Sequence, residues 1–390
     1  MGCKTINSPA SFEFFSWLTA TACLYWLLPP AMRRYLLIVS TAGILAYADP
    51  KSLLALSVMT TVVCIAMQIK GAWRNSSLLS ACAVVLVTLV AFKLLETTQT
   101  TPSMTDRLIP LGLSFYSLRC VHLLIERYLG QIERPATLQV IEYLFFPPTI
   151  MAGPIHRYPA YAAEQPGAFS FAMFSAGLER ILYGYVKIVV IGNYLLNLQF
   201  SRWILLRFDP DTAGYQYFDA LNYGLNLYFQ FSGYSDIAIG FALIFGHKIM
   251  ENFSWPLLQP NIVMFWRNWH ISLTSLCREY VFAGVYAATR QAWAGVFLTM
   301  LAVSLWHGLT LNYLAWGLYH AAGILVCQQW SKSAAAKYLQ RTLPSPVNRL
   351  IGWFLTFQFV MLGFVWTKEV DIAASFDAYM KIISGVFGSV

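Results

Sequence analysis

Two stretches, FWRNWH at residues 265–270 and WHG at residues 306–308, decide how this chain is built. Each places a histidine, His270 or His307, inside otherwise apolar sequence. An ionisable side chain at membrane depth is costly, and it usually faces the interior of a helical bundle or a water-filled cavity. Two such histidines in one chain therefore predict a buried reaction centre rather than a wall that faces lipid.

The composition of the chain is that of a membrane protein. Of its 390 residues, 58% are hydrophobic and 11% are charged, whereas a soluble domain carries about 25% charged residues. We expect an all-α, polytopic integral membrane protein with about ten to twelve membrane-embedded helices, some of them re-entrant or broken around a central cavity. The apolar stretches lie near residues 11–29, 33–49, 52–69, 77–95, 108–128, 139–152, 169–200, 215–247, 261–282, 291–309, 311–330 and 349–366.

The chain shows no soluble domain and no linker long enough to detach one, so residues 1–390 are expected to form a single membrane-embedded domain. It comprises peripheral spans at 1–107, a core at 108–330, and a cytoplasmic loop with a last span at 331–390. The polar stretches predicted to be loops lie at 96–107, 157–168, 208–214 and 331–348.

The core contains breaks that a simple bundle would not need. Pro147-Pro148 and Gly153-Pro154 interrupt an apolar segment, and proline removes a helical donor. Irregular backbone at membrane depth is tolerated only where it is buried in protein or lines a cavity.

The segment at 261–282 carries a polar stripe. On a continuous helix Arg267, His270, Thr274 and Arg278 would share one face, and two arginines at a lipid-exposed helix centre would cost about 5–7 kcal/mol. The stripe should therefore face protein, water, head groups or substrate, although the pattern also fits an amphipathic helix at the membrane interface.

A second polar group lies in the 215–247 segment. The amides of Asn222, Asn226 and Gln230 recur every four residues, which is typical of hydrogen bonding between helices. Ser235 and Asp236 follow. The carboxylate should have a partner, and an arginine or histidine of the 261–282 segment is the expected one.

The net charge of +8 does not indicate a nucleic-acid partner, because the cations are spread between the apolar segments. Under the positive-inside rule the loops at 30–35, 70–76 and 331–349 are cytoplasmic and the N-terminus is outside. No cleavable signal peptide is expected, because Lys4 is the only basic residue before the first apolar segment. The seven cysteines contain no CxxC spacing, so packing is expected and a metal site is not.

The two histidines can support proton transfer. A neutral imidazole accepts a proton from a hydroxyl near pH 7, and His307 lies between Trp306, a rigid wall, and Gly308, which allows close approach. His270 could orient a donor, hydrogen-bond an oxyanion or hold an acceptor. Because nucleophile-elbow, P-loop and dinucleotide motifs are absent, direct transfer between two bound substrates fits better than covalent catalysis.

Supporting positions surround these histidines. Trp266 and Arg267 precede His270 in the first stretch, and His320 shares a helical face with Tyr313 and Trp316. We expect His320 to pack behind the site rather than react.

The sequence resembles the membrane-bound O-acyltransferase family in motifs that occur in the expected order. These are PLGLSFY at 110–116, FFPPTIMAGPI at 145–155, FSGYSDIAIG at 231–240, ENF at 251–253, FWRNWHISL at 265–273 and LWHG at 305–308. The bacterial branch that transfers D-alanine to teichoic acid is the most similar, and the alginate O-acetyltransferase branch is the second choice. Departures include Glu279 in place of aspartate.

The resemblance implies a funnel that holds His307 as the catalytic residue and His270 as its partner. The donor would be a cytoplasmic thioester, on the phosphopantetheine of an acyl carrier protein or on coenzyme A, with no permanently bound cofactor. The acceptor would be an extracytoplasmic polymer or a partner acyltransferase, and the expected location is the bacterial cytoplasmic membrane. Two rivals remain open: a transporter whose histidines relay protons, and a non-catalytic scaffold.

Overall fold

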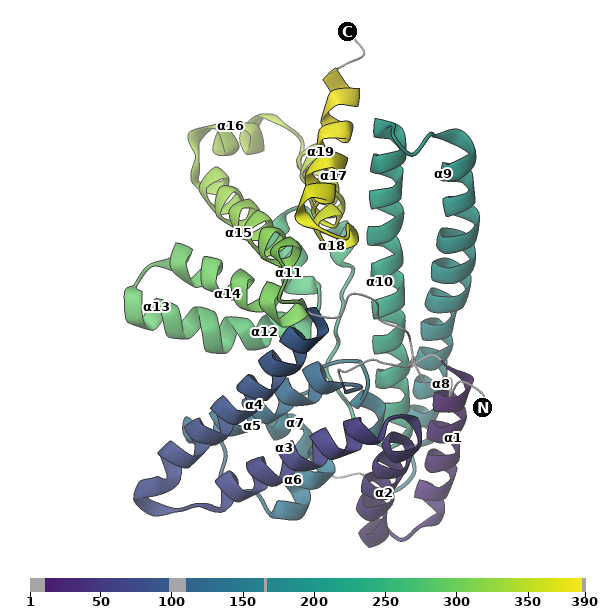
Figure 1. The fold of residues 1–390 in the computed structure, drawn as a ribbon, viewed down its shortest axis with the longest axis vertical. Helices are drawn as coiled ribbons and strands as arrows, with labels where there is room; N and C mark the ends of the chain where they lie inside the picture. Colours follow the sequence, from purple (N-terminus) through teal and green to yellow (C-terminus); the bar gives the residue numbers. More distant parts are fainter. Residues whose placement is uncertain (1–10, 98–109, 165–166, 388–390) are drawn as a thin grey trace. The chain divides into compact units, whose positions relative to one another are not determined.

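The computed structural model describes residues 11–97, 110–164 and 167–387, and every regular element in these ranges is a helix (Figure 1). The predicted all-α class is therefore confirmed. The chain divides into two compact units, Met1–Tyr185 with Gly233–Glu251 and Val186–Ser232 with Asn252–Val390. The prediction about Lys4 and most of the loop expected at 96–107 lie outside the described residues.

Unit 1 is a bundle of helices followed by a broken segment. Its helices are α1 (Phe12–Leu27), α2 (Pro30–Ala48), α3 (Pro50–Gln68), the short η1 (Gly71–Trp73), α4 (Arg74–Thr97), α5 (Leu113–Tyr128), α6 (Thr137–Leu144), η2 (Pro147–Thr149), α7 (Tyr158–Ala163), α8 (Phe171–Tyr185) and the last part of α10 (Ala213–Ile244). Helices α3, α4 and α5 pack side by side (Figure 1). The start of α3 follows from local chemistry, because Asp49 caps it and Pro50 occupies its first position.

The proline-broken segment of unit 1 is buried in protein, as the sequence required. Arg119 of α5 is 1% exposed, and its guanidinium donates to the carbonyl oxygens of Tyr143 and Leu144, each at 3.2 Å. It also donates to the hydroxyl of Thr149 at 3.1 Å. A buried cation thus satisfies carbonyls that the interrupted helix leaves unpaired.

Helices α8 and α10 cross closely within unit 1. A Cβ added to Gly177 would lie 2.7 Å from the carbonyl oxygen of Gly240, and one added to Gly184 would lie 2.7 Å from that of Gly233. Small residues at such crossings let two backbones approach, which is a common way to pack helices in membranes.

Unit 2 carries both stretches with which the sequence analysis began. Its helices are the π-helical η3 (Val186–Phe200), α9 (Ser201–Arg207), the first part of α10, η4 (Pro256–Leu258), α11 (Ile262–Asn268), α12 (Ile271–Cys277), the π-helical η5 (Arg278–Phe282), α13 (Ala283–Thr289), α14 (Ala292–His307), α15 (Leu311–Lys332), α16 (Ala334–Thr342), α17 (Ser345–Gly363), α18 (Val365–Lys368) and α19 (Ile372–Phe387). Helices α14 and α15 form a hairpin (Figure 1).

The amide ladder expected between helices of unit 2 is present. Asn222 donates to the hydroxyl of Ser201 at 2.8 Å, and Gln230 donates to Asn193 at 2.7 Å. Asn226 also bonds an asparagine of η3. These amides tie α10 to η3 and α9, as the four-residue spacing predicted.

The chain is a polytopic membrane protein. Within the described residues, four helical stretches are long and apolar enough to cross a bilayer by length and composition: Pro50–Gln68, Gly71–Leu95, Phe171–Arg207 and Ser345–Lys368. Three short or amphipathic helices were not predicted. α7 and α16 occupy stretches expected to be loops, and α19 lies beyond the last expected span.

Candidate active site

His270 lies at a kink between two short helices, so the prediction that it belongs to one continuous helix over 261–282 was wrong. Helix α11 ends before it and α12 begins after it. Its φ of 45° is in the left-handed region, which costs a residue with a side chain of order 1–3 kcal/mol. The carbonyl oxygen of His270 accepts the backbone N–H of Thr274 at 2.9 Å, which starts the second helix.

Asn252 holds the His270 ring from one side. Its Oδ1 lies 3.0 Å from Nδ1 of His270, and it also accepts the hydroxyl of Ser272 at 2.9 Å and the backbone N–H of Ser272 at 3.4 Å. Because this oxygen is an acceptor, Nδ1 carries the proton and Nε2 carries the lone pair. His270 is 1% exposed, and its Nε2 has no hydrogen-bond partner among the described residues.

His307 is the last residue of α14 and is half-buried. The chain turns at Gly308, and the hydroxyl of Thr310 caps α15 by accepting the N–H of Tyr313 at 3.4 Å. This turn stacks the Tyr313 ring on His307, with centroids 6.0 Å apart and planes inclined by 10°. A Cβ at Gly308 would overlap the Tyr313 ring, so glycine is required for the stack.

The structure brings the two histidines together in unit 2. Their ring centroids lie 6.5 Å apart. Trp306 packs against both rings: its ring centroid lies 5.7 Å from that of His270 and 4.8 Å from that of His307. Trp316 lies 5.6 Å from His307 on the opposite helix of the hairpin. The pair is therefore held in an aromatic cage, and the Nε2 of His270 in it has no hydrogen-bond partner within the described parts of the chain.

A second layer supports this cage. The indole N–H of Trp266 donates to Nδ1 of His320 at 3.3 Å, and the His320 ring lies 5.0 Å from Trp316. His320 is 1% exposed. It thus lies behind Trp316, while the roles of all these residues remain predictions.

A cavity of about 260 Å³ lies beside the cage in unit 2. Arg267 and Arg278 line it and are exposed. Arg267, Thr274 and Arg278 of the predicted polar stripe line this cavity, whereas His270, which lies at the kink, does not. The lining residues are Val263, Trp266, Arg267, Thr274, Arg278, Phe282, Val296, Thr299, Met300, Val303, Ile324 and Gln328.

The sequence profile of the membrane-bound O-acyltransferase family matches residues 39–366, a range that contains the whole cage. The chain belongs to this family. Both branches named from the sequence are among its relatives.

Three relatives of this acyltransferase-family chain show the range of similarity. A probable alginate O-acetylase from Pseudomonas aeruginosa is 33% identical over 72% of this chain and 53% of the relative. A teichoic acid D-alanyltransferase from Bacillus subtilis is 31% identical over 65% and 67%, and a peptidoglycan O-acetyltransferase from Helicobacter pylori is 26% identical over 72% and 57%. The chain spans about half the length of the alginate relatives that it matches.

Ser235 and Asp236 of the family motif lie in unit 1, and both residues are buried. The ion pair of Asp236 is with Arg180 of α8, whose Nε lies 2.7 Å from Oδ1. Arg180 also pairs with Glu251. The expectation of a partner from the 261–282 segment is thus replaced by an arginine that lies between the two glycines of the α8 crossing.

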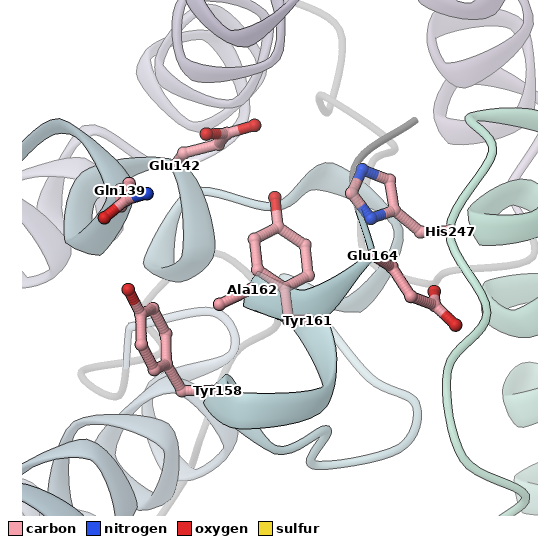
Figure 2. A pocket seen from close by; sticks show the side chains of 7 residues that line it. All are labelled: Gln139, Glu142, Tyr158, Tyr161, Ala162, Glu164 and His247. Atoms are coloured by element: carbon pink, nitrogen blue, oxygen red, sulfur yellow. The ribbon is translucent and has the colours of Figure 1, made fainter. Parts of the chain in front are cut away.

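Figure 2 shows a smaller cavity of the acyltransferase-family chain, of about 20 Å³, in unit 1. His247, in the loop after α10, stacks on Tyr161 with centroids 4.8 Å apart. The cavity has room for about one water molecule, and its lining residues are Gln139, Glu142, Tyr158, Tyr161, Ala162, Glu164 and His247.

The sequence analysis did not identify two residues that hold candidate site residues in place. Asn252, which holds His270, lies in the ENF motif, but an asparagine has no chemistry that singles it out in a sequence. Arg180 lies in a long apolar segment, where an unpaired cation is a signal that could have pointed to Asp236.

Proposed function

We propose that this chain is an O-acyltransferase that moves a short acyl group, D-alanyl or acetyl, from a thioester to a hydroxyl. In this proposal His307 is the general base that takes the proton of the acceptor hydroxyl, and His270 assists from its fixed position beside His307. The observation that carries the proposal is the pair itself, with ring centroids 6.5 Å apart and no partner for the Nε2 of His270 among the residues that the structure describes.

The proposed step is R–CO–S–R′ plus R″–OH giving R–CO–O–R″ plus R′–SH. The hydroxyl oxygen bonds to the acyl carbon, and the carbon–sulfur bond breaks. His307 takes the hydroxyl proton and returns it to the leaving thiolate, so the proton balance closes without a bound cofactor. General base catalysis of this kind contributes about 10²–10⁴-fold to a rate.

We place the donor on the cytoplasmic side, as a thioester on an acyl carrier protein or on coenzyme A. The acceptor is a cell-envelope glycopolymer or a partner acyltransferase that passes the acyl group on, and the location is the bacterial cytoplasmic membrane. The names of the relatives, which refer to alginate, teichoic acid and peptidoglycan, support an envelope polymer.

Acetyl transfer of the alginate type is the second form of this proposal. It is favoured by four relatives of that name that are 33–34% identical over 72% of the chain, against 31% over 65% for the B. subtilis teichoic acid relative. Membrane vesicles supplied with either a D-alanyl or an acetyl thioester would identify the acyl group from the labelled product.

The test of the proposal is His307→Ala in membrane vesicles, with transfer of labelled acyl group to extracted polymer as the measurement. We expect a loss of about 10²–10⁴-fold. His247→Gln, which changes a histidine of unit 1, is the control and should keep transfer. A folded His307→Ala protein with wild-type transfer would refute the catalytic assignment, and substrate accumulation without any covalent product would favour a transporter.

A further inference from the structure

Helix α16 and the helix ends on either side of it form a surface that carries positive charge only. The chain has no aspartate or glutamate between Glu279 and Glu369. The cations in and beside α16, which together we call the basic surface of α16, are Lys332, Lys337, Arg341 and Arg349. All four are exposed, and none of their side chains forms an ion pair or a hydrogen bond within the described parts of the chain. A group of exposed cations without acidic partners attracts an anionic one.

Hydrogen bonds at both ends hold α16 in one place. At its start the hydroxyl of Ser333 caps the helix by accepting the N–H of Ala336 at 3.1 Å. At its end the side-chain amide of Asn348, which belongs to α17, donates to the carbonyl oxygens of Leu339 and Leu343 at 3.2 and 3.3 Å. Ala336 is 2% exposed, so one face of α16 packs inward, and the helix contacts both α15 and α17 (Figure 1). The basic surface is therefore a fixed feature of unit 2.

Helix α16 lies at the end of a candidate membrane span. The stretch Ser345–Lys368, which begins with α17, is long and apolar enough to cross a bilayer. Helix α16 ends at Thr342, just before this stretch. The basic surface therefore lies where the span leaves the hydrocarbon, at the level of the lipid head groups.

The exposed side of α16 combines charge with apolar surface. Lys337 and Arg341 lie four residues apart, so their side chains project from the same side of the helix. Tyr338 is 67% exposed, and tyrosine is enriched at the interface between a membrane and water. Lysine and arginine bury their aliphatic stems along apolar surface while their charged ends stay in water. The partner that matches both properties is a phosphate above an acyl chain, which is the chemistry of an acidic phospholipid.

We propose that the basic surface of α16 binds the head groups of acidic phospholipids, with a lipid phosphate between Lys337 and Arg341. Arginine matches a phosphate through two parallel hydrogen bonds, and lysine adds a point charge. Lys332, the last residue of α15, and Arg349, near the start of α17, extend the surface to neighbouring lipids. None of these cations lines the cavity beside the histidine pair, so the inference does not depend on acyl transfer.

The experiment measures binding of phosphatidylglycerol and of phosphatidylcholine to the purified full chain in a non-ionic detergent, by native mass spectrometry. The wild type should bind phosphatidylglycerol more tightly, because the head group of phosphatidylcholine has no net charge. The variants are Lys337→Gln, Arg341→Gln and the double variant. A cation near an acidic lipid surface contributes about fivefold to affinity, equivalent to about 1 kcal/mol. Each single variant should therefore weaken phosphatidylglycerol binding about fivefold and the double variant about 25-fold, while phosphatidylcholine binding stays the same.

Arg207→Gln is the matched control. Arg207 is also an exposed arginine at the end of a candidate span, but Asp209 follows it two residues later. This variant should bind phosphatidylglycerol like the wild type. Lys337→Arg and Arg341→Lys keep the charge of the surface and should retain the preference for phosphatidylglycerol, which a merely structural role of the two side chains would not predict.

Equal affinity of the wild type for the two lipids, or an unchanged affinity of the double variant for phosphatidylglycerol, would overturn the inference. Loss of the preference in the charge-retaining variants would overturn it as well. Displacement of phosphatidylglycerol by the same concentration of inorganic phosphate would show a site for free phosphate instead. If the wild type prefers neither lipid and the double variant loses binding to an acyl carrier protein, the basic surface of α16 docks a protein and the lipid proposal is wrong.

Discussion

His122 of unit 1 and His270 of unit 2 are both buried histidines in apolar sequence, but their hydrogen-bond partners differ. In unit 1 the Nε2 of His122 accepts the backbone N–H of Tyr158 at 3.1 Å, and Arg157 lies 3.4 Å from its other nitrogen. In unit 2 His270 is held through Nδ1 by Asn252, while Nε2 stays unpaired beside His307. The acceptor nitrogen of His122 is thus used by the backbone, whereas that of His270 has no partner among the described residues and is available to a substrate.

The largest effect that would sharpen this comparison is expected from Asn252→Ala. The change removes the acceptor that holds Nδ1 of His270, so the ring loses its fixed tautomer and orientation. Misplacement of a catalytic group by about 1 Å can cost up to about 10²-fold, and we expect transfer to fall by about ten- to a hundredfold. Asn252→Asp retains the acceptor and should restore a large part of the rate, which a purely structural role would not predict.

A smaller effect is expected from Gly308→Ala, because the added Cβ overlaps the Tyr313 ring that stacks on His307. Overpacking of this kind costs about 1–3 kcal/mol, and the displaced ring should lower transfer about tenfold or less. Gly284→Ala is the matched control, since its Cβ would meet nothing within 4 Å. Equal transfer by both variants in vesicles would show that the stack does not position His307.

The smallest effect on transfer is expected from His122→Gln in unit 1. The glutamine oxygen is not held at the position of Nε2, and a misplaced partner for the buried N–H of Tyr158 costs about 1–3 kcal/mol, so thermal unfolding should occur at a lower temperature. Transfer per folded molecule should not change. A loss of transfer in a fully folded His122→Gln protein would remove the distinction between His122 and His270.

Much of the fold followed from the sequence. Apolar stretches predicted helices that the structure contains, and the spacing of Asn222, Asn226 and Gln230 predicted the amide ladder. The errors have a common cause. The kink at His270 depends on Asn252, which bonds both His270 and Ser272 from outside the helix, and such a contact is invisible to helical periodicity.

The site was predictable in its chemistry but not in its geometry. The sequence by itself determined an all-α membrane protein with two histidines that must be shielded from lipid, because the cost of a polar group in hydrocarbon is a property of the residue and its neighbours in the chain. The tertiary structure alone decided that His270 and His307 meet, that Arg180 is the partner of Asp236, and that Arg267 and Arg278 line a cavity. Those facts depend on contacts between residues far apart in the chain, whose energies arise only when the helices pack.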